Sequence, residues 1–357
     1  MAESQNIEWK ESWRDEYLKW ICGFANAQGG VLNIGINDNG EPIGLKDTKS
    51  LLEDIPNKIV TLLGIVADVN LQEKNGLEYI EIVVHKSNMP IAYKGVYHYR
   101  SGSTKQELKG QALQDFLLKK LGMTWDDMAD ERATIDDINP DAVAYFQKVA
   151  VANKRMDKEA VSDDVWSVLQ NLNLINEEGK IKKAALLLFG KQPEKFVSAP
   201  YFRIGRFRKD DTDLIFQDSV ECDLIRMADR VVELLKSKYL ISPIYYEGLR
   251  RIEDLEIPED ALREAIFNAI IHKDYTGVHI QMKVWDDRVE IWNDGGLPYD
   301  MSIEKLLGPH TSKPRNVNIA SVFYKAGFIE SWGRGILKIQ KGFADSGIKA
   351  PLFEEDC

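Results

Sequence analysis

Three acidic residues near the start of the chain have the types and the spacing of a divalent-metal site. Glu3 and Glu8 lie five residues apart, and Asp38 comes at the end of the apolar run VLNIGIND. Mg²⁺ and Mn²⁺ prefer oxygen ligands, and Lys10 beside the cluster could offset the charge of a phosphate. Charged residues at a chain start are more often solvated, so the sequence by itself leaves a surface role open.

A second group of residues supplies hydrogen-bond donors for phosphate. It lies in the segment YRSGSTK and consists of Arg100, Ser101, Ser103, Thr104 and Lys105. Such donors contact phosphate oxygens without reading base sequence. Together with Lys10 they are the predicted nucleic-acid contacts, and they do not distinguish RNA from DNA.

A third group falls on one face of a helix predicted after Pro258. Glu264, Asn268 and His272 are spaced at i, i+4 and i+8, so a carboxylate, an amide and an imidazole form one row. The opposite face is apolar, which predicts a largely buried helix whose polar groups need partners. The alternative is a core amide satisfied within the protein, next to a surface glutamate.

Hydrophobic periodicity predicts the elements that carry the first two groups. A helix over residues 15–27 ends at Gly29 and Gly30 and leads into a strand that ends at Asp38. Further predicted elements are a helix at 51–63, strands at 77–84 and 96–100, and a closing helix at 106–121. The pattern indicates an α+β domain over residues 1–122 within a multidomain chain.

The remainder divides into a charged linker and two further parts. The linker is predicted at 123–137, a middle α/β segment at 138–255 and a C-terminal domain at 256–357. The middle segment is expected to contain helices at 141–152, 165–172 and 220–238 and strands at 184–189 and 201–207. After the helix at Pro258, the C-terminal part is expected to contain strands at 278–285 and 289–292, an irregular stretch at 301–332 and a helix from Gly335.

Composition and charge exclude several classes of protein. The 57 acidic and 46 basic side chains give a net charge of −11, which excludes a histone-like binder and confines any nucleic-acid contact to a local patch. Three cysteines without a C-x-x-C pair provide neither a disulfide framework nor a cysteine zinc site. The polar N-terminus and the short apolar runs predict a cytoplasmic protein with no membrane partner.

The first 120 residues resemble the Schlafen-type AlbA_2 domain. The resemblance rests on ESQNIEWKE, FANAQGGVLNIGINDNG and YHYRSGSTKQ, with Trp9 in place of a phenylalanine and Ala27 in place of a threonine. It implies a nucleic-acid-binding domain. In ribonuclease members of the Schlafen family three matching acids cut RNA with a divalent metal, which would make Glu3, Glu8 and Asp38 the catalytic and metal-binding residues.

Residues 258–345 resemble the GHKL ATP-binding fold, an α/β sandwich. REAIFNAIIHKDY, VEIWNDGGLP and ESWGRGILKI are similar to its N-box, G1 and G2 motifs. The resemblance implies ATP with Mg²⁺ or Mn²⁺ as cofactor. By it, Asn268 would bind the metal on the phosphates, Glu264 would orient a water for ATP hydrolysis, and His272 would belong to the same nucleotide site.

The glycine turns of this region complete the implied nucleotide site. The G1 turn can be aligned as Asp294 with Gly296 or as Asn293 with Gly295, and the second alignment lacks the carboxylate that accepts from adenine. Gly333 and Gly335 open a helix whose amides would face phosphate, and residues 301–332 would form a lid. Glycines that only close a strand end are the alternative.

The two resemblances imply a protein that binds nucleic acid and ATP and acts as a transcriptional regulator. The alternative is a Schlafen-like, metal-dependent endoribonuclease, with or without a weak ATPase activity. A homo-oligomer is compatible with either. The last residues, FEEDC, stop where relatives often continue, so a C-terminal domain that extends beyond Cys357 also agrees with the sequence.

Overall fold

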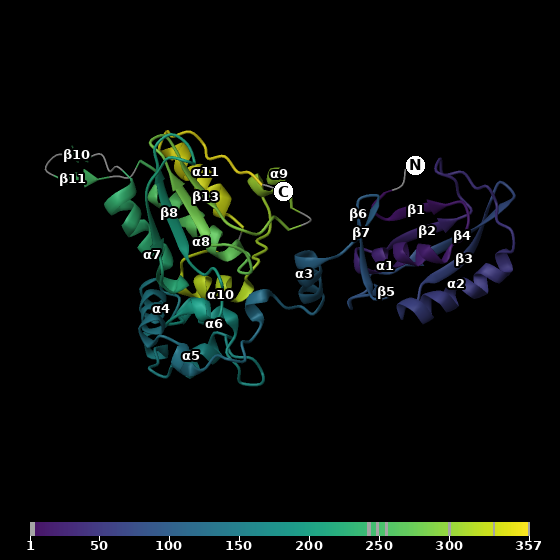
Figure 1. The fold of residues 1–357 in the computed structure, drawn as a ribbon, viewed down its shortest axis with the longest axis horizontal. Helices are drawn as coiled ribbons and strands as arrows, with labels where there is room; N and C mark the ends of the chain where they lie inside the picture. Colours follow the sequence, from purple (N-terminus) through teal and green to yellow (C-terminus); the bar gives the residue numbers. More distant parts are fainter. Residues whose placement is uncertain are drawn as a thin grey trace. The chain divides into compact units, whose positions relative to one another are not determined.

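The computed structural model consists of two compact units, Met1–Met123 and Thr124–Cys357 (Figure 1). It describes residues 4–240, 244–247, 250–253, 256–298, 301–330 and 333–355. In the described part of the chain no helix is long and apolar enough to cross a bilayer. Each unit has its own hydrophobic core, so each is considered by itself.

A four-stranded sheet in the order β1-β2-β4-β3 forms the centre of the first unit (Figure 1). β1 (Ile7–Lys10) runs parallel to β2 (Gly30–Ile34), whereas β4 (Leu77–Val84) is antiparallel to both β2 and β3 (Asp68–Lys74). The helices α1 (Leu18–Asn26) and α2 (Thr48–Leu63) bury Leu18, Ile21 and Ile59 in the same core as Leu32 and Ile80 of the sheet. A short 3-10 turn, Asp15–Tyr17, precedes α1.

A second, three-stranded sheet follows in the same unit. It contains β5 (Ala92–Tyr93), β6 (Val96–Ser101) and β7 (Thr104–Glu107), and the closing helix α3 spans Gly110–Lys120. The predicted helix start at residue 106 is therefore wrong. Thr104–Glu107 pairs with β6 instead, because the two-residue turn at Gly102 folds it back onto that strand.

The second unit contains a mixed sheet in the order β13-β12-β8-β9. β8 (Phe202–Phe207) and β12 (Ile280–Val284) are parallel, and β9 (Leu214–Val220) and β13 (Val289–Trp292) pair antiparallel at their outer sides. A hairpin of β10 (Ile244–Glu247) and β11 (Arg250–Glu253) lies between these strands in sequence. The domain boundary predicted between residues 255 and 256 therefore does not separate two sheets. β8 precedes this boundary in the sequence and β12 follows it, yet the two strands pair directly.

Helices supply the rest of the second core. α4 (Pro140–Ala152), α5 (Val165–Asn171), α6 (Lys183–Phe189), α7 (Leu224–Leu234), α8 (Glu259–His272) and α10 (Val317–Ala326) all contribute buried apolar residues to one cluster with β8 and β12. α9 (Ile303–Leu307) and α11 (Gly335–Asp345) complete the unit (Figure 1). A π-helical turn, Leu235–Tyr239, extends α7.

Three sequence predictions differ from this arrangement. Residues 184–189 form α6 and not a strand, because all six are buried and a run buried on every side carries no periodicity. The segment predicted as a linker belongs to the second unit, where buried Asp126 accepts a hydrogen bond from the backbone of Ile319 at 2.9 Å. Part of the predicted lid is α10, which buries Phe323 in the core.

Candidate nucleic-acid and nucleotide sites

The Glu8 carboxylate is buried between two cations. Its Oε2 lies 2.6 Å from Nη1 of Arg100, and its Oε1 accepts a hydrogen bond from Nζ of Lys10 at 2.5 Å. Only 3% of the Glu8 surface is exposed, and none of the Arg100 surface is. Strand pairing places both groups, because β1 lies beside β2 at one edge of the sheet and β6 brings Arg100 against it.

Arg100 has a structural role, so its predicted role as a phosphate contact is wrong. Its Nη2 donates to the backbone oxygens of Ser4 at 2.8 Å and Ile7 at 3.3 Å. Its guanidinium also lies 5.2 Å from the centre of the Phe24 ring. A side chain with no exposed surface cannot reach a phosphate from solvent, and here it ties β6 to the chain start and β1.

The three predicted metal ligands are not assembled in the described part of the chain. Glu3 lies outside the described residues, and Asp38 is exposed in the turn after β2. Among the described residues no group of three His, Cys, Asp or Glu side chains is placed to hold a metal ion. Glu8 does not suit a divalent ion in this arrangement, because the ion would have to displace Arg100 or Lys10 from its carboxylate.

The hairpin of β6 and β7 presents the other predicted phosphate contacts. Ser101, Ser103 and Thr104 are exposed, and the hydroxyl of Thr104 donates to the carbonyl of Ser101 at 2.9 Å. Gln5 accepts a hydrogen bond from the amide of Gly102 at 2.5 Å and donates to the carbonyl of Arg100 at 2.8 Å. Gln5 thus holds the turn through two hydrogen bonds, while Ser101, Ser103 and Thr104 stay exposed.

Lysines and aromatic rings gather beside this hairpin. Nζ of Lys105 lies 4.9 Å from the centre of the Trp20 ring, and Nζ of Lys10 lies 5.4 Å from it. Burial lowers the pKa of Lys105, and the nearby charge of Lys19 lowers it further. The sequence interpretation included Lys10 and Lys105 but missed Trp13, Tyr17, Lys19 and Trp20, although 13, 17 and 20 have the i, i+4, i+7 spacing of one helical face.

In the second unit, the polar face of α8 lies against the glycine turn at 333–335. A methyl group added at Gly335 would overlap Oε1 of Glu264 and lie 3.3 Å from Nδ2 of Asn268. Burial raises the pKa of Glu264, and the charge of Lys338 on α11 partly offsets this effect. Nδ2 of Asn268 is buried and has no hydrogen-bond partner among the described residues. The structure therefore brings Glu264, Asn268 and Gly335 together.

The other end of α8 contacts the turn at 293–296. Gly295 has a φ of +114°, and a methyl group there would lie 3.0 Å from the carbonyl of His272 and 3.0 Å from Nε of Arg315. Burial, together with the positive charge of Arg315, lowers the pKa of His272 to about 4. One helix thus borders both glycine turns, with His272 at one and Glu264 at the other.

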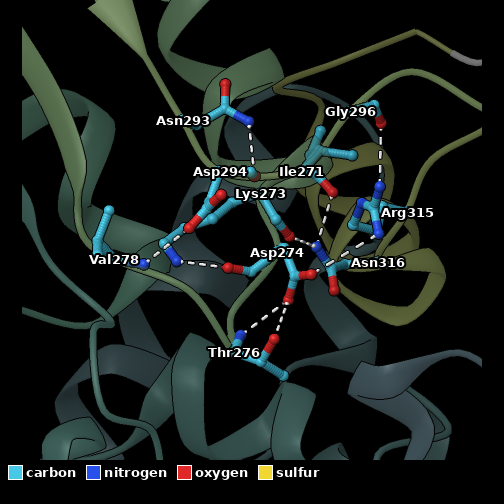
Figure 2. Close-up of polar contacts among 10 residues, drawn as sticks. All are labelled: Ile271, Lys273, Asp274, Thr276, Val278, Asn293, Asp294, Gly296, Arg315 and Asn316. Atoms are coloured by element: carbon cyan, nitrogen blue, oxygen red, sulfur yellow. Dashed lines mark hydrogen bonds and ion pairs between the residues drawn. The ribbon is translucent and has the colours of Figure 1, made fainter. Parts of the chain in front are cut away.

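Figure 2 shows how the residues after α8 fix the 293–296 turn. Oδ2 of Asp294 accepts the backbone N–H of Val278 at 3.0 Å, and the side chain of Asn293 donates to the carbonyl of Asp294 at 3.1 Å. Nη2 of Arg315 donates to the carbonyl of Gly296 at 3.0 Å. One carboxylate oxygen of Asp294 therefore orients the residues that lead into β12.

Sequence reasoning missed two residues at the centre of this network, Lys273 and Asp274. Lys273 is fully buried, its Nζ donates to the carbonyl of Asp274 at 2.7 Å, and burial lowers its pKa to about 8. The side chain of Asn316 donates to the carbonyls of Ile271 and Lys273 at 2.9 and 2.8 Å (Figure 2). The signal in the sequence was a Lys-Asp pair directly after the polar helix face.

Comparisons with known proteins find one family match in each of the two units. Residues 3–109 match the family model described as "Schlafen, AlbA_2", and residues 277–357 match the one described as "Putative ATP-dependent DNA helicase recG C-terminal". The second match begins after α8, so the roles given to Glu264 and Asn268 stay predictions. A search of the curated proteins finds no match.

One solved structure aligns with nearly the whole chain, and another aligns with about a third of it. The DIP2311 protein from Corynebacterium diphtheriae is 20% identical with a TM-score of 0.52, and the alignment covers 99% of this chain and 73% of that one, which shows a common fold. The N-terminal domain of a RecG-related putative ATP-dependent DNA helicase from Nitrosomonas europaea is 25% identical over 31% of this chain and 88% of that one, with a TM-score of 0.24. The predicted mixed α+β organisation is confirmed: the chain carries a Schlafen-type AlbA_2 domain at its N-terminus and an ATPase-like domain at its C-terminus.

Proposed function

We propose that this protein binds nucleic acid through its first unit and ATP through its second, and that it acts as a transcriptional regulator. Two kinds of observation support this. The AlbA_2 match coincides with an exposed hydroxyl-rich hairpin beside Lys10 and Lys105. The ATPase-like match adjoins a helix whose polar face borders two glycine turns.

The single observation that carries the nucleotide site is the unsatisfied amide of Asn268 beside Gly335. A buried amide without a hydrogen bond costs free energy, so such a group is kept where a ligand can satisfy it. The orphaned atom, Nδ2, is a hydrogen-bond donor and would donate to a phosphate oxygen, whereas Oδ1 of the same side chain would hold Mg²⁺, and that ion would neutralise phosphate charge. Glu264, whose pKa burial raises, would orient a water for ATP hydrolysis.

Calorimetry with ATP·Mg²⁺ tests the nucleotide site directly. We expect wild type to bind and Asn268→Ala to lose at least tenfold in affinity, because a methyl group replaces both polar atoms of the amide. Asn57→Ala, on α2 in the first unit, is the matched control and should bind as wild type does. No heat with wild type at millimolar nucleotide, or equal binding by Asn268→Ala, would refute the assignment.

Nucleic-acid binding is expected to depend strongly on salt. Lysine contacts release counterions from the phosphate backbone, so each one adds to the slope of affinity against salt. Lys105→Ala should weaken binding and reduce that slope by about one. A flat salt dependence, or a strong preference for one duplex sequence, would contradict a phosphate-directed surface.

We favour binding without cleavage over the ribonuclease alternative, because Glu8 is neutralised by Arg100 and Lys10. Incubation of labelled RNA and DNA with Mn²⁺ is the deciding assay. We expect both probes to stay intact. Cleavage that stops in excess chelator and in Asp38→Ala would show that the carboxylates can rearrange around a metal and would reverse this preference.

A further inference from the structure

The aromatic ridge of the first unit consists of Trp13, which precedes the 3-10 turn, Tyr17, which ends that turn, and Trp20, which lies in the first turn of α1. The ring centres of Trp13 and Tyr17 are 6.4 Å apart and those of Tyr17 and Trp20 are 6.0 Å apart, with interplanar angles of 84° and 82°. All three side chains are half-buried. In an edge-to-face pair, the ring that donates its edge keeps its own face uncovered by the neighbour.

Three lysines surround the aromatic ridge. Nζ of Lys10 lies 5.9 Å from the centre of the Tyr17 ring, and Lys10 and Lys105 both lie over Trp20. Lys19 is close enough that its charge lowers the pKa values of both Lys105 and His98. The like charges of Lys19 and Lys105 repel each other, and a phosphate placed near them would relieve the repulsion.

The rings of the aromatic ridge have one side on the core and another toward solvent. They pack against the cluster that contains Leu18, Ile21 and Phe24, yet all three stay partly exposed, whereas those core residues are fully buried. Lysines over aromatic rings at partly exposed positions make weak contacts, weaker than the stacking of a base on the same ring. A base can therefore take the face of the Trp20 ring while the ammonium group of Lys105 moves to the adjoining phosphate.

From this arrangement we propose that the aromatic ridge is a binding site for unpaired nucleobases, so that the first unit prefers single-stranded to duplex nucleic acid. The inference rests on the nucleic-acid binding proposed above and names its substrate class. Rings stack on bases of any sequence, and the bases of a duplex are already stacked on one another. The lysines hold the phosphates of the same strand. No sequence preference is expected.

The test is the affinity of the full chain for a fluorescent 12-mer, measured by anisotropy, as single-stranded RNA, as single-stranded DNA and as the RNA duplex. We expect Tyr17→Leu to lose about tenfold for both single strands and less than twofold for the duplex, because stacking on one ring is removed and the lysines remain. Tyr17→Phe keeps the ring and should bind as wild type does. It also shows that any loss in Tyr17→Leu comes from the ring and not from the hydroxyl.

Tyr324→Leu is the matched control. Tyr324 is an exposed tyrosine of the second unit with Arg155 4.8 Å from its ring centre, so it has the same ring and a similar cation but lies outside the ridge. It should leave all three affinities unchanged. Thermal unfolding of each variant verifies that the first unit is folded.

The outcomes separate this inference from the function on which it rests. The proposed role of the aromatic ridge is refuted if wild type binds the duplex more tightly than the single strands. It is also refuted if Tyr17→Leu binds single strands as wild type does. If Lys105→Ala at the same time weakens the binding of every probe, the proposed nucleic-acid binding stands and only the role of the aromatic ridge is refuted. If wild type binds none of the three probes, both proposals are refuted.

Discussion

Glu8 of the first unit is buried and Glu264 of the second is half-buried, and the surroundings of the two carboxylates differ. Glu8 is 3% exposed and has Arg100 and Lys10 on its two oxygens. Glu264 is half-buried, and burial raises its pKa despite the charge of Lys338. A carboxylate held by fixed cations belongs to the fold, whereas one whose burial is not compensated can respond to the charge of a ligand.

The comparison teaches that the type of a residue in a motif does not determine its role. Both glutamates were expected to act in catalysis because of the family resemblances seen in the sequence. The pairing of Glu8 with a buried arginine makes it a stabilising residue here. The Glu264 face, in contrast, retains an unsatisfied amide at Asn268. The predictions below test this difference, beginning with the largest effect.

Removing Glu8 should unfold the first unit locally. Glu8→Ala leaves the charge of Arg100 buried without a carboxylate, which costs about 3–5 kcal/mol. Hydrogen exchange of the backbone amides of β1 and β2 measures this loss within the first unit. The double variant Glu8→Leu with Arg100→Met should recover most of the stability, because no buried charge remains. If Glu8→Ala left hydrogen exchange in β1 and β2 unchanged, the pair of Glu8 and Arg100 would not be structural.

A substitution at Gly333 should destabilise the turn that faces Glu264. Gly333 has a φ of +64°, and a methyl group there would overlap the carbonyl of His310, so Gly333→Ala should cost about 2–4 kcal/mol. Gly347 has a φ of +66° with no atom within 4 Å of the added methyl group. Gly347→Ala should therefore cost only about 1 kcal/mol. Chemical unfolding of the two variants checks the difference, and equal losses would mean that the 310–312 segment does not pack on this turn.

His272 should make the second unit lose stability in acid. The pKa of His272 is lowered from 6.5 to about 4 in the folded state, so below pH 6.5 the unfolded chain binds a proton that the folded chain does not. Stability attributable to His272 is thus intact above pH 6.5 and falls as the pH approaches 4, by on the order of 2–3 kcal/mol.

Unfolding at pH 7 and at pH 4.5 without nucleotide measures this dependence. His272→Gln cannot take up the proton, so it should lose less stability than wild type between these two values. Parallel losses in the two proteins would show that His272 is accessible to protons in the folded state.

The smallest effect on stability is expected for Glu264→Gln, and it completes the comparison with Glu8. The amide has the same shape and carries no charge to bury, so stability should stay the same or rise slightly. ATP binding should persist while any hydrolysis is lost, because an amide is not a base. Calorimetry combined with a phosphate-release assay measures both properties. A loss of several kcal/mol would place Glu264 with Glu8 among the structural residues.

The sequence by itself determined the elements with a clear local period. The helix after Pro258 was predicted from the apolar spacing opposite Glu264 and Asn268, and the structure contains it as α8. Strands were also predicted at 77–84 and 201–207, and the structure contains them as β4 and β8. The two motif sets were sufficient to identify the AlbA_2 and ATPase-like domains. These signals are local, since periodicity and motif spacing involve residues close together in the chain.

Only the tertiary structure decided which polar groups are available for chemistry. Arg100 and Glu8 are 92 residues apart, and no local pattern shows that β6 buries one against the other. α6 has no polar face, because the protein surrounds it on all sides. The aromatic ridge likewise became a candidate site only when β7 placed Lys105 over Trp20. Burial and long-range pairing depend on the packing of distant segments, and that packing determines whether a charge is part of the fold or free to meet a ligand.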